Sequence, residues 1–226
     1  FLVRSARLAA AIARRCGDEA WAAHCEALGD GVQARTWARW AAHATTTQTG
    51  CATALRFAIV PAAERPAVED ALARLVREAD GRVATGFLGT SLVLPALSAA
   101  GRFDEAYRML LRTDLPSWLY QAKMGATTVW ERWDAIRPDG SIHPGTMTTP
   151  PEMAERTEGD PHMLSFNHYS YGACIDWVYR NLAGIAPDED HPGYRHVIVA
   201  PRPVAGIDHV SASIETPFGH AAVAWQ

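Results

Sequence analysis

The sequence lacks the signals of two common classes of binding protein. No apolar run approaches the roughly 20 residues that a membrane-spanning helix requires. The 21 basic and 25 acidic residues are spread without long runs of one sign. A basic stripe for nucleic acid and a polybasic segment for a membrane surface are therefore both missing. We expect neither nucleic acid nor a membrane as a partner, and the pattern predicts no particular oligomeric state.

Cysteine is scarce, and its spacing is irregular. The four cysteines, Cys16, Cys25, Cys51 and Cys174, form no CxxC pair. Reduced cysteines that pack in a core fit this arrangement better than a disulfide framework does. The first residues read as an amphipathic helix interrupted by arginines, not as a signal peptide. We therefore expect a reducing compartment, the cytoplasm.

Several motifs of catalysis and metal binding are also missing. ATGFLGTS (84–91) is not a phosphate-binding loop, because it lacks the GK[ST] ending and no strand precedes it; Thr90 is expected to cap the following helix. GxSxG is absent. No two of the scattered histidines share a helical face, so no metal site is predicted. These histidines are His143, His162, His191, His196, His209 and His220.

Helical periodicity dominates the first half of the chain. Apolar residues recur at spacings of three and four, with glycine or proline between the segments. The predicted helices are 2–28, 31–45, 47–59, 65–79, 90–100 and 103–112, with stops at Gly29, Pro61, Gly81 and Gly101. They form helical hairpins. Helical spacing returns after Asn167 and stops at Gly184.

The end of the chain has a different pattern of apolar and polar residues. From Gly193 onward, HVIVAPRP, HVSASIETPFG and HAAVAWQ are short alternating segments broken by proline and glycine. Such segments are typical of antiparallel strands. The sequence thus predicts a helical layer followed by a β domain, with the join near 185–193.

The segment GATTVWERWD (125–134) places a carboxylate, Glu131, between Trp130 and Trp133. Indoles exclude water and make ionisation costly, which is an environment suited to a general base. If 130–134 were one helical turn, Glu131 and Asp134 would share a face. The alternative is that Glu131 pairs with Arg132 or another arginine while the tryptophans pack in the core.

A second candidate is His168 in SFNHYSYG, where a loop enters a helix that Asn167 could cap. A lone histidine beside aromatic residues also fits a structural hydrogen-bonding role. Between the two candidates, residues 143–164 carry four prolines and no periodicity. They are expected to form a surface loop, either a lid or an inert insertion.

Taken together, the motifs resemble one family. TQTGCATALRF, TGFLGT, the run from LPALSAAGRFDEAYRML to VWERWD, SFNHYSYGACIDWVYRNLAGI and PGYRHVIVAPRP occur in this order in bacterial α-L-rhamnosidases of glycoside hydrolase family 78. The resemblance implies a mainly α fold, with part of an (α/α)₆ toroid at 1–188 and the first strands of a β-sandwich domain at 189–226.

The resemblance also implies a chemistry. The family releases terminal α-L-rhamnose from glycosides with inversion, which needs a protonated acid on the leaving oxygen and a carboxylate that activates water. By this likeness Glu131 would be the general base, His168 would bind rhamnose hydroxyls, and Trp130 and Trp133 would shape the pocket. No cofactor is implied, because two carboxylates and water suffice.

The chain departs from the family pattern in one respect. The acidic, arginine-containing motif that supplies the general acid is not found before Glu131. We therefore expect a fragment that is inactive by itself. Two alternatives remain open: another toroidal glycosidase or lyase, or a carbohydrate-binding protein without turnover.

Overall fold

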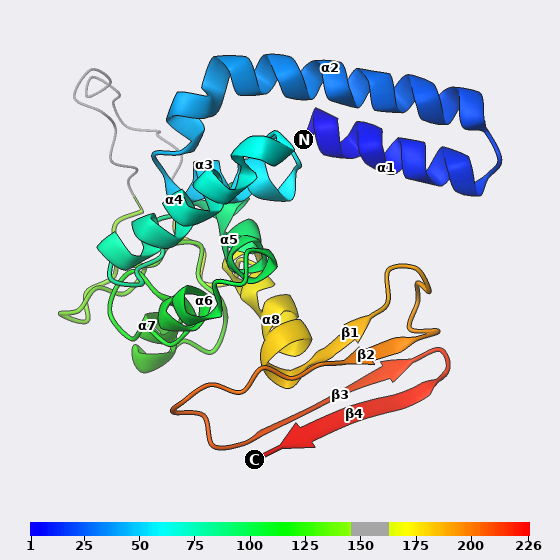
Figure 1. Ribbon diagram of the computed structural model, residues 1–226. Helices are drawn as coiled ribbons and strands as arrows, with labels where there is room; N and C mark the ends of the chain where they lie inside the picture. The colour runs from blue at the N-terminus through cyan, green and yellow to red at the C-terminus, as the bar shows by residue number, and fades with distance from the viewer. Residues whose placement is uncertain (146–162) are drawn as a thin grey trace. The chain divides into compact units, whose positions relative to one another are not determined.

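The computed structural model describes residues 1–145 and 163–226, so most of the predicted 143–164 loop lies outside the described residues. The chain forms two compact units, Phe1–Tyr171 and Gly172–Gln226. The first unit is helical and the second carries the strands (Figure 1).

A long helical hairpin opens the first unit. α1 (Leu2–Arg15) and α2 (Glu19–Ala44) lie side by side (Figure 1). The turn between them contains Gly17 at φ +81°, and the Asp18 side chain caps α2 by accepting a hydrogen bond from the Trp21 backbone N–H at 2.9 Å. Glycine tolerates this left-handed conformation and aspartate is a preferred N-cap.

The prediction of one helix over 2–28 with a stop at Gly29 was wrong. Gly29 lies buried inside α2, where an added Cβ would sit 3.6 Å from the Cβ of Ala6. This glycine lets the two helices approach closely instead of ending one of them. Small residues of α1, including Ala6 and Ala10, are buried at this contact.

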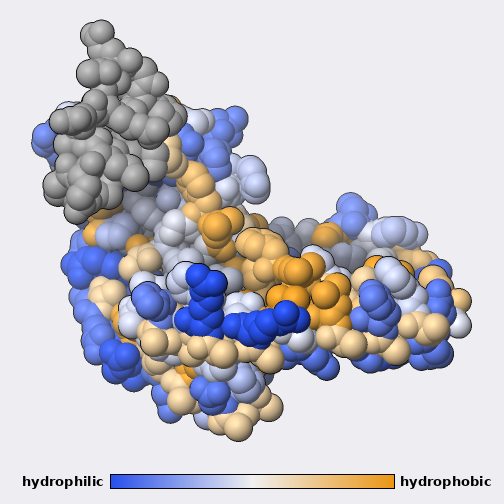
Figure 2. Space-filling view, turned by 90° about the horizontal axis from the view of Figure 1, so that it is seen from above, coloured by the Kyte–Doolittle hydropathy of each residue, from blue (hydrophilic) through white to orange (hydrophobic). Residues whose placement is uncertain are grey.

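The same hairpin exposes several large apolar side chains among its charged ones. Its exposed side chains include Leu2, Leu8, Ile12, Trp21, Leu28 and Trp40. Figure 2 shows hydrophobic surface among charged side chains on the face seen from above. Exposed apolar side chains that gather in this way are found on surfaces that pack against further protein.

Shorter helices complete the first unit. They are α3 (Gln48–Arg56), α4 (Arg65–Glu78), α5 (Phe87–Ala99), α6 (Phe103–Leu110) and α7 (Trp118–Lys123), with a 3₁₀ turn at Ala62–Glu64. Aliphatic side chains of α4 and α5, among them Leu72, Leu94 and Leu97, are fully buried. Among the described residues, no helix is long and apolar enough to cross a membrane.

The start of α5 differs from the prediction. The helix begins at Phe87, with Gly86 as its N-cap residue, so Thr90 lies inside the helix and does not cap it. The buried Thr90 hydroxyl donates to the Gly86 carbonyl at 2.9 Å and lies 2.8 Å from the Thr85 hydroxyl. These two contacts of the Thr90 hydroxyl replace the expected cap. Phe87 is therefore the first residue of α5.

The second unit begins with a short helical segment and continues as two strand pairs. α8 (Cys174–Trp177) runs into a π-helix (Val178–Ala183), which ends at Gly184 in the left-handed conformation. This confirms the stop predicted at Gly184. A 3₁₀ turn, Ser170–Ala173, spans the division between the units.

The strands are antiparallel, as predicted. β1 (Ile185–Pro187) pairs with β2 (Val197–Val199), and Pro187 lies opposite Val197. β3 (Val210–Thr216) pairs with β4 (Gly219–Trp225). Burial alternates along β3, which is the period-two pattern of a half-buried strand. β1 was not predicted.

Candidate active site

Two loop segments of the first unit lie side by side and bring the predicted residues together. The backbone N–H of Glu131 donates to the carbonyl of Ser165 at 2.9 Å, and that of His168 donates to the carbonyl of Val129 at 2.7 Å. The Thr128 hydroxyl donates to the carbonyl of Phe166, on the same segment as Ser165 and His168. Glu131 and His168, 37 positions apart in the sequence, thus belong to one local structure.

The carboxylate of Glu131 is half-buried and held at one oxygen. Its Oε2 accepts a hydrogen bond from the backbone N–H of Ser165 at 2.8 Å. Within the described part of the chain, Oε1 has no hydrogen-bond partner and the carboxylate makes no ion pair. One oxygen is therefore fixed while the other is available to a ligand.

Asp134 has a different environment from Glu131. Residues 130–134 form turns and bends, so the two carboxylates do not share a helical face. Arg132 Nε donates to Asp134 Oδ1 at 3.0 Å, and His143 Nε2 lies 3.6 Å from Asp134 Oδ2. Burial raises the pKa of Asp134, but the hydrogen bond and charge of Arg132 outweigh it and the pKa is below its usual value. Asp134 is ionised at neutral pH and holds the loop together.

His143 completes this polar cluster. Its Nε2 lies 3.0 Å from Arg132 Nη2, and its Nδ1 accepts from the Gly145 backbone N–H at 2.9 Å. Burial, together with the positive charge of Arg132, lowers the pKa of the imidazole. His143 is thus neutral at pH 7 and acts as a structural hydrogen-bonding group.

The two tryptophans beside Glu131 have different surroundings. Trp130 is 2% exposed and meets Phe166 edge-on at 5.7 Å between ring centroids. Trp133 is half-buried and stacks on Tyr171 at 3.9 Å with only 5° between the ring planes. Trp133 also meets Trp118 edge-on at 5.6 Å. Trp133 retains some surface for a ligand, whereas Trp130 is almost enclosed.

His168 is partly exposed and rests on an aromatic support. Its ring stacks on Phe87 at 4.7 Å and 16°, and Phe87 also contacts Tyr171. His168 Nδ1 accepts from the Ser170 backbone N–H at 3.4 Å, which leaves the proton of a neutral ring on Nε2. In the described ranges Nε2 has no protein partner. The cap suggested for Asn167 is not formed by its exposed side chain.

Sequence reasoning missed two side chains that support this site. Gln121, 5% exposed on α7, accepts from the Trp130 N–H at 3.2 Å and donates to the Arg132 carbonyl at 3.3 Å. A single glutamine on a short helix carries no pattern that reveals this role. Phe87 lies within the TGFLGT motif, but placing the helix start at Thr90 put this aromatic residue in the preceding loop.

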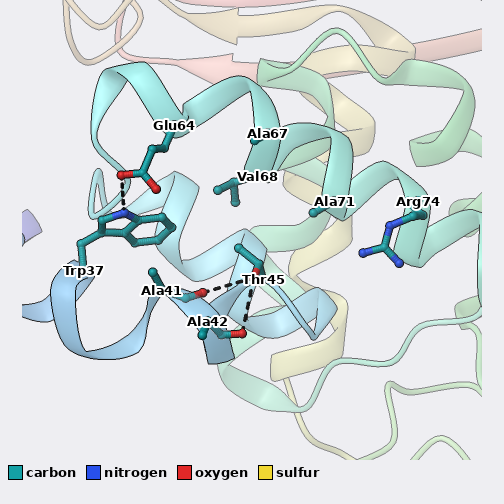
Figure 3. A pocket seen from close by; sticks show the side chains of 9 residues that line it. All are labelled: Trp37, Ala41, Ala42, Thr45, Glu64, Ala67, Val68, Ala71 and Arg74. Carbon is teal, nitrogen blue, oxygen red and sulfur yellow. Dashed lines mark hydrogen bonds between the residues drawn. The ribbon is translucent and has the colours of Figure 1, made fainter.

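A second groove on the first unit is lined by other residues. It has a volume of about 450 Å³ and lies between the end of α2 and α4 (Figure 3). Its carboxylate, Glu64, accepts from Trp37 Nε1 at 2.8 Å. The other lining residues include small apolar ones such as Ala67 and Ala71. None of the predicted site residues lines it.

The family models match nearly the whole chain. Residues 1–182 match the bacterial alpha-L-rhamnosidase 6 hairpin glycosidase domain, and residues 184–226 match the bacterial alpha-L-rhamnosidase C-terminal domain. The helical hairpins, with a carboxylate and aromatic side chains in their connecting loops, therefore define a six-hairpin glycosidase domain followed by antiparallel strands. The chain belongs to the bacterial α-L-rhamnosidase family.

Individual relatives agree with this assignment. The chain is 39% identical over 180 residues to an α-L-rhamnosidase of Streptomyces avermitilis and 35% identical over 182 residues to one of Formosa agariphila, covering 80% of this chain in each case. These matches span only 16% and 18% of the relatives.

Solved structures give the same result. The chain resembles the α-L-rhamnosidase of Aspergillus terreus with a TM-score of 0.85 and 32% identity, and that of Streptomyces avermitilis in complex with L-rhamnose with a TM-score of 0.83 and 36% identity. Each match covers 99% of this chain, but only 24% and 20% of the respective structures.

Proposed function

We propose that this chain is part of the catalytic region of an inverting α-L-rhamnosidase, in which Glu131 is the general base. Membership in the family supports the substrate class. The observation that carries the role of Glu131 is its half-buried carboxylate, which is anchored through Oε2 and, among described residues, unpaired at Oε1. A base must accept a proton from water, so an oxygen already occupied by a cation would be unsuited to the task.

The proposed reaction uses two carboxyl groups and one water. Oε1 of Glu131 takes a proton from water as the water oxygen attacks the anomeric carbon, and the bond to the aglycone oxygen breaks. A protonated acid on the opposite face donates to that leaving oxygen. The two groups are separated by about 6.5–9.5 Å in inverting enzymes, which leaves space for the water. No metal or organic cofactor is required.

His168 and the tryptophans are assigned to substrate binding. His168 Nε2–H can donate to a rhamnose hydroxyl, while stacking on Phe87 fixes the plane of the imidazole. Trp133 offers an aromatic face to the C–H bonds of the deoxysugar, and its stack on Tyr171 holds that face in place. Trp130 shapes the pocket wall from behind, through its contact with Phe166.

We also propose that the general acid lies outside this chain and that the isolated chain does not hydrolyse rhamnosides. The relatives are several times longer than the matched region, and no acidic motif of the expected type precedes Glu131. The large apolar side chains that α1 and α2 expose suit packing against further hairpins of a toroid.

A cytoplasmic location is part of the same proposal. All four cysteines are free thiols. Burial raises the pKa of Cys51 and of Cys174 to about 11, so both remain protonated and unreactive at neutral pH. The absence of long runs of one charge sign in the sequence supports a small glycoside, not nucleic acid or a membrane, as the partner.

The test is Glu131→Gln in the intact enzyme, with an aryl α-L-rhamnoside as substrate. Loss of a general base is expected to lower kcat by about 10² to 10⁴-fold, while L-rhamnose affinity changes little. Glu19→Gln, at an exposed position on α2, is the matched control and should keep full activity. NMR of the first product formed should show inverted anomeric configuration.

Three results would contradict the proposal. An E131Q enzyme with normal kcat would remove Glu131 from the chemistry. Cleavage of glucosides or uronates without cleavage of rhamnosides would indicate a different toroidal glycosidase or lyase. Sugar binding with no turnover by the intact wild-type protein would indicate a carbohydrate-binding protein.

A further inference from the structure

The second unit contains a cluster of three side chains with metal-binding atoms. Asp188, His191 and His196 lie in the connection between β1 and β2. The Nδ1 atoms of both histidines are 2.9 Å from the same oxygen, Oδ2 of Asp188. The three potential ligand atoms all lie within 4.8 Å of one another.

The backbone holds the carboxylate in this orientation. Asp188 directly follows β1 and His196 directly precedes β2, and the Asp188 N–H continues the strand pairing by donating to the His196 carbonyl at 3.1 Å. The Asp190 N–H donates to Asp188 Oδ1 at 3.0 Å, so the other oxygen, Oδ2, faces the two imidazoles. A metal ligand whose second oxygen is hydrogen-bonded is typical of built metal sites.

The third potential ligand, His191, is positioned by the loop between β1 and β2. The His191 N–H donates to the Asp188 carbonyl at 3.2 Å, which forms a turn at the start of the connection. Tyr194, a non-glycine residue, adopts φ +62°. Such a conformation is disfavoured for a residue with a Cβ and persists only where surrounding interactions hold it. A bound ion that joins both ends of the connection would help to hold it.

The donor set and its spacing suit one kind of ion. Imidazole nitrogens bind borderline transition metals such as Zn²⁺, at about 2.0–2.1 Å, and carboxylate oxygens bind Zn²⁺ at about 2.0–2.2 Å. Ligand atoms of a tetrahedral site at these distances are about 3.3 Å apart. The observed N···O separations of 2.9 Å need to open by only a few tenths of an ångström. The two imidazole nitrogens lie within 4.8 Å of one another and need to reach the same separation of about 3.3 Å.

We propose that Asp188, His191 and His196 bind one Zn²⁺ ion that joins the two ends of the β1–β2 connection. The ion would take the place of the two protons that otherwise lie between the imidazoles and the carboxylate. Both imidazoles are exposed, which leaves the fourth position open to water.

This site is independent of the proposed rhamnosidase chemistry. Its ligands belong to the second unit, whereas Glu131 and His168 belong to the first. Helical spacing does not reveal it, because D-x₂-H-x₄-H converges here through the turn of a strand pair and not through a helical face.

The same unit supplies a matched control. His220 Nδ1 lies 2.6 Å from Glu215 Oε1 across the β3–β4 pair. This is a histidine–carboxylate pair of the same chemistry, but it is not part of any group of three ligands among the described residues. His220→Ala therefore removes a histidine of similar exposure without touching the proposed site.

The test is a Zn²⁺ titration of the full protein, purified without a histidine tag and treated with a chelator. Isothermal calorimetry should show one Zn²⁺ per chain for the wild type and for H220A. His191→Ala, His196→Ala and Asp188→Asn should each weaken binding by more than about 10-fold, since loss of a direct ligand exceeds the loss seen for supporting contacts. Co²⁺ substitution should give the visible absorption of a four-coordinate ion.

Far-UV circular dichroism checks that each variant is folded, which is expected because the substituted histidines are exposed. Two results would overturn the proposal. The first is no Zn²⁺ binding by the wild-type protein at up to about 1 mM metal, the weak end of the affinity scale. The second is binding that is unchanged in the His191→Ala and His196→Ala variants.

Discussion

The helical core and the loops of the candidate site are held together in different ways. In α4 and α5, buried leucines contact many neighbours at once, so the helices depend on the sum of many weak contacts. In the loops around Glu131, single hydrogen bonds join segments far apart in the sequence. Stability therefore resides mainly in the first region and the geometry of the proposed site in the second, and substitutions should separate the two.

The largest effect is expected for Leu97→Ala in the core of α5. Leu97 is fully buried, so truncation removes apolar contacts and leaves a cavity. The expected loss is about 2–5 kcal/mol of the free energy of unfolding, measured by urea denaturation. Leu88, on the same helix and 66% exposed, is the control. Leu88→Ala should cost less than about 0.5 kcal/mol. Equal losses of the free energy of unfolding for Leu97→Ala and Leu88→Ala would contradict the idea that buried contacts stabilise the helical core.

The next largest effect is expected for Gln121→Ala, which removes a single link in the loop region. The buried Trp130 N–H loses its acceptor, at a cost of about 1–3 kcal/mol. Activity of the intact enzyme should fall by more than this loss of stability explains, because the Glu131 segment loses its support. Near-UV circular dichroism reports the tryptophan environment directly.

Gln121→Glu sharpens the same test. The carboxylate keeps an acceptor for the Trp130 N–H but buries a charge and places an oxygen against the Arg132 carbonyl, so a loss of stability at neutral pH at least as large as that of Gln121→Ala is expected. Lys123→Ala, at an exposed position on the same helix, is the control. If Gln121→Ala and Lys123→Ala behave alike, Gln121 does not support the site.

Much of the helical region could be predicted because its pattern is local. The predicted segments 65–79 and 103–112 correspond to α4 and α6 within two residues. The errors in helix boundaries arose at residue types that can play two different structural roles. Gly29 serves helix packing and not a stop, and Thr90 bonds inside a helix and does not cap it. Single-sequence periodicity does not distinguish these uses.

The sequence motifs of the site could be predicted, but the contact between them could not. Glu131 and His168 were singled out by their aromatic neighbours, and the family resemblance gave them their roles, but periodicity gave no reason for them to meet. Their contact depends on backbone hydrogen bonds between Glu131 and Ser165 and between His168 and Val129. Any residue can accept such a bond and any residue except proline can donate one, so these bonds cannot be predicted from composition.

A moderate effect is expected for Trp133→Leu, which removes the stack on Tyr171. Aromatic pairs contribute about 0.5–1.5 kcal/mol beyond buried area, and the loss should appear in the free energy of unfolding. Rhamnose affinity of the intact enzyme should also fall, because Trp133 is proposed to face the sugar. Trp21→Leu, at a residue 54% exposed on α2, is the control for loss of an indole. Unchanged sugar affinity in Trp133→Leu would limit Trp133 to a packing role.

The smallest effect concerns Asp134 and depends on pH. The hydrogen bond and charge of Arg132 hold the pKa of Asp134 below its usual value despite burial. A carboxylate whose pKa is lowered by folding stabilises the protein above the unfolded pKa, near 3.8, and this contribution is lost as the pH falls through the lowered folded value. The side chain is 32% exposed, so solvent screening keeps the contribution below about 1 kcal/mol.

The measurement is the difference in free energy of unfolding between wild type and Asp134→Asn, determined by urea titration at pH 7, 5 and 3. The difference should be largest at pH 7, nearly as large at pH 5, and smaller at pH 3, which lies below the unfolded pKa near 3.8, so that the unfolded chain binds a proton more readily than the folded one. Asp104→Asn, at an exposed residue of α6, controls for loss of one negative charge. A difference for Asp134→Asn that stays constant over this range would show that Asp134 contributes hydrogen-bond geometry and not charge. The loops would then differ from the helical core in the number of their contacts but not in their response to pH.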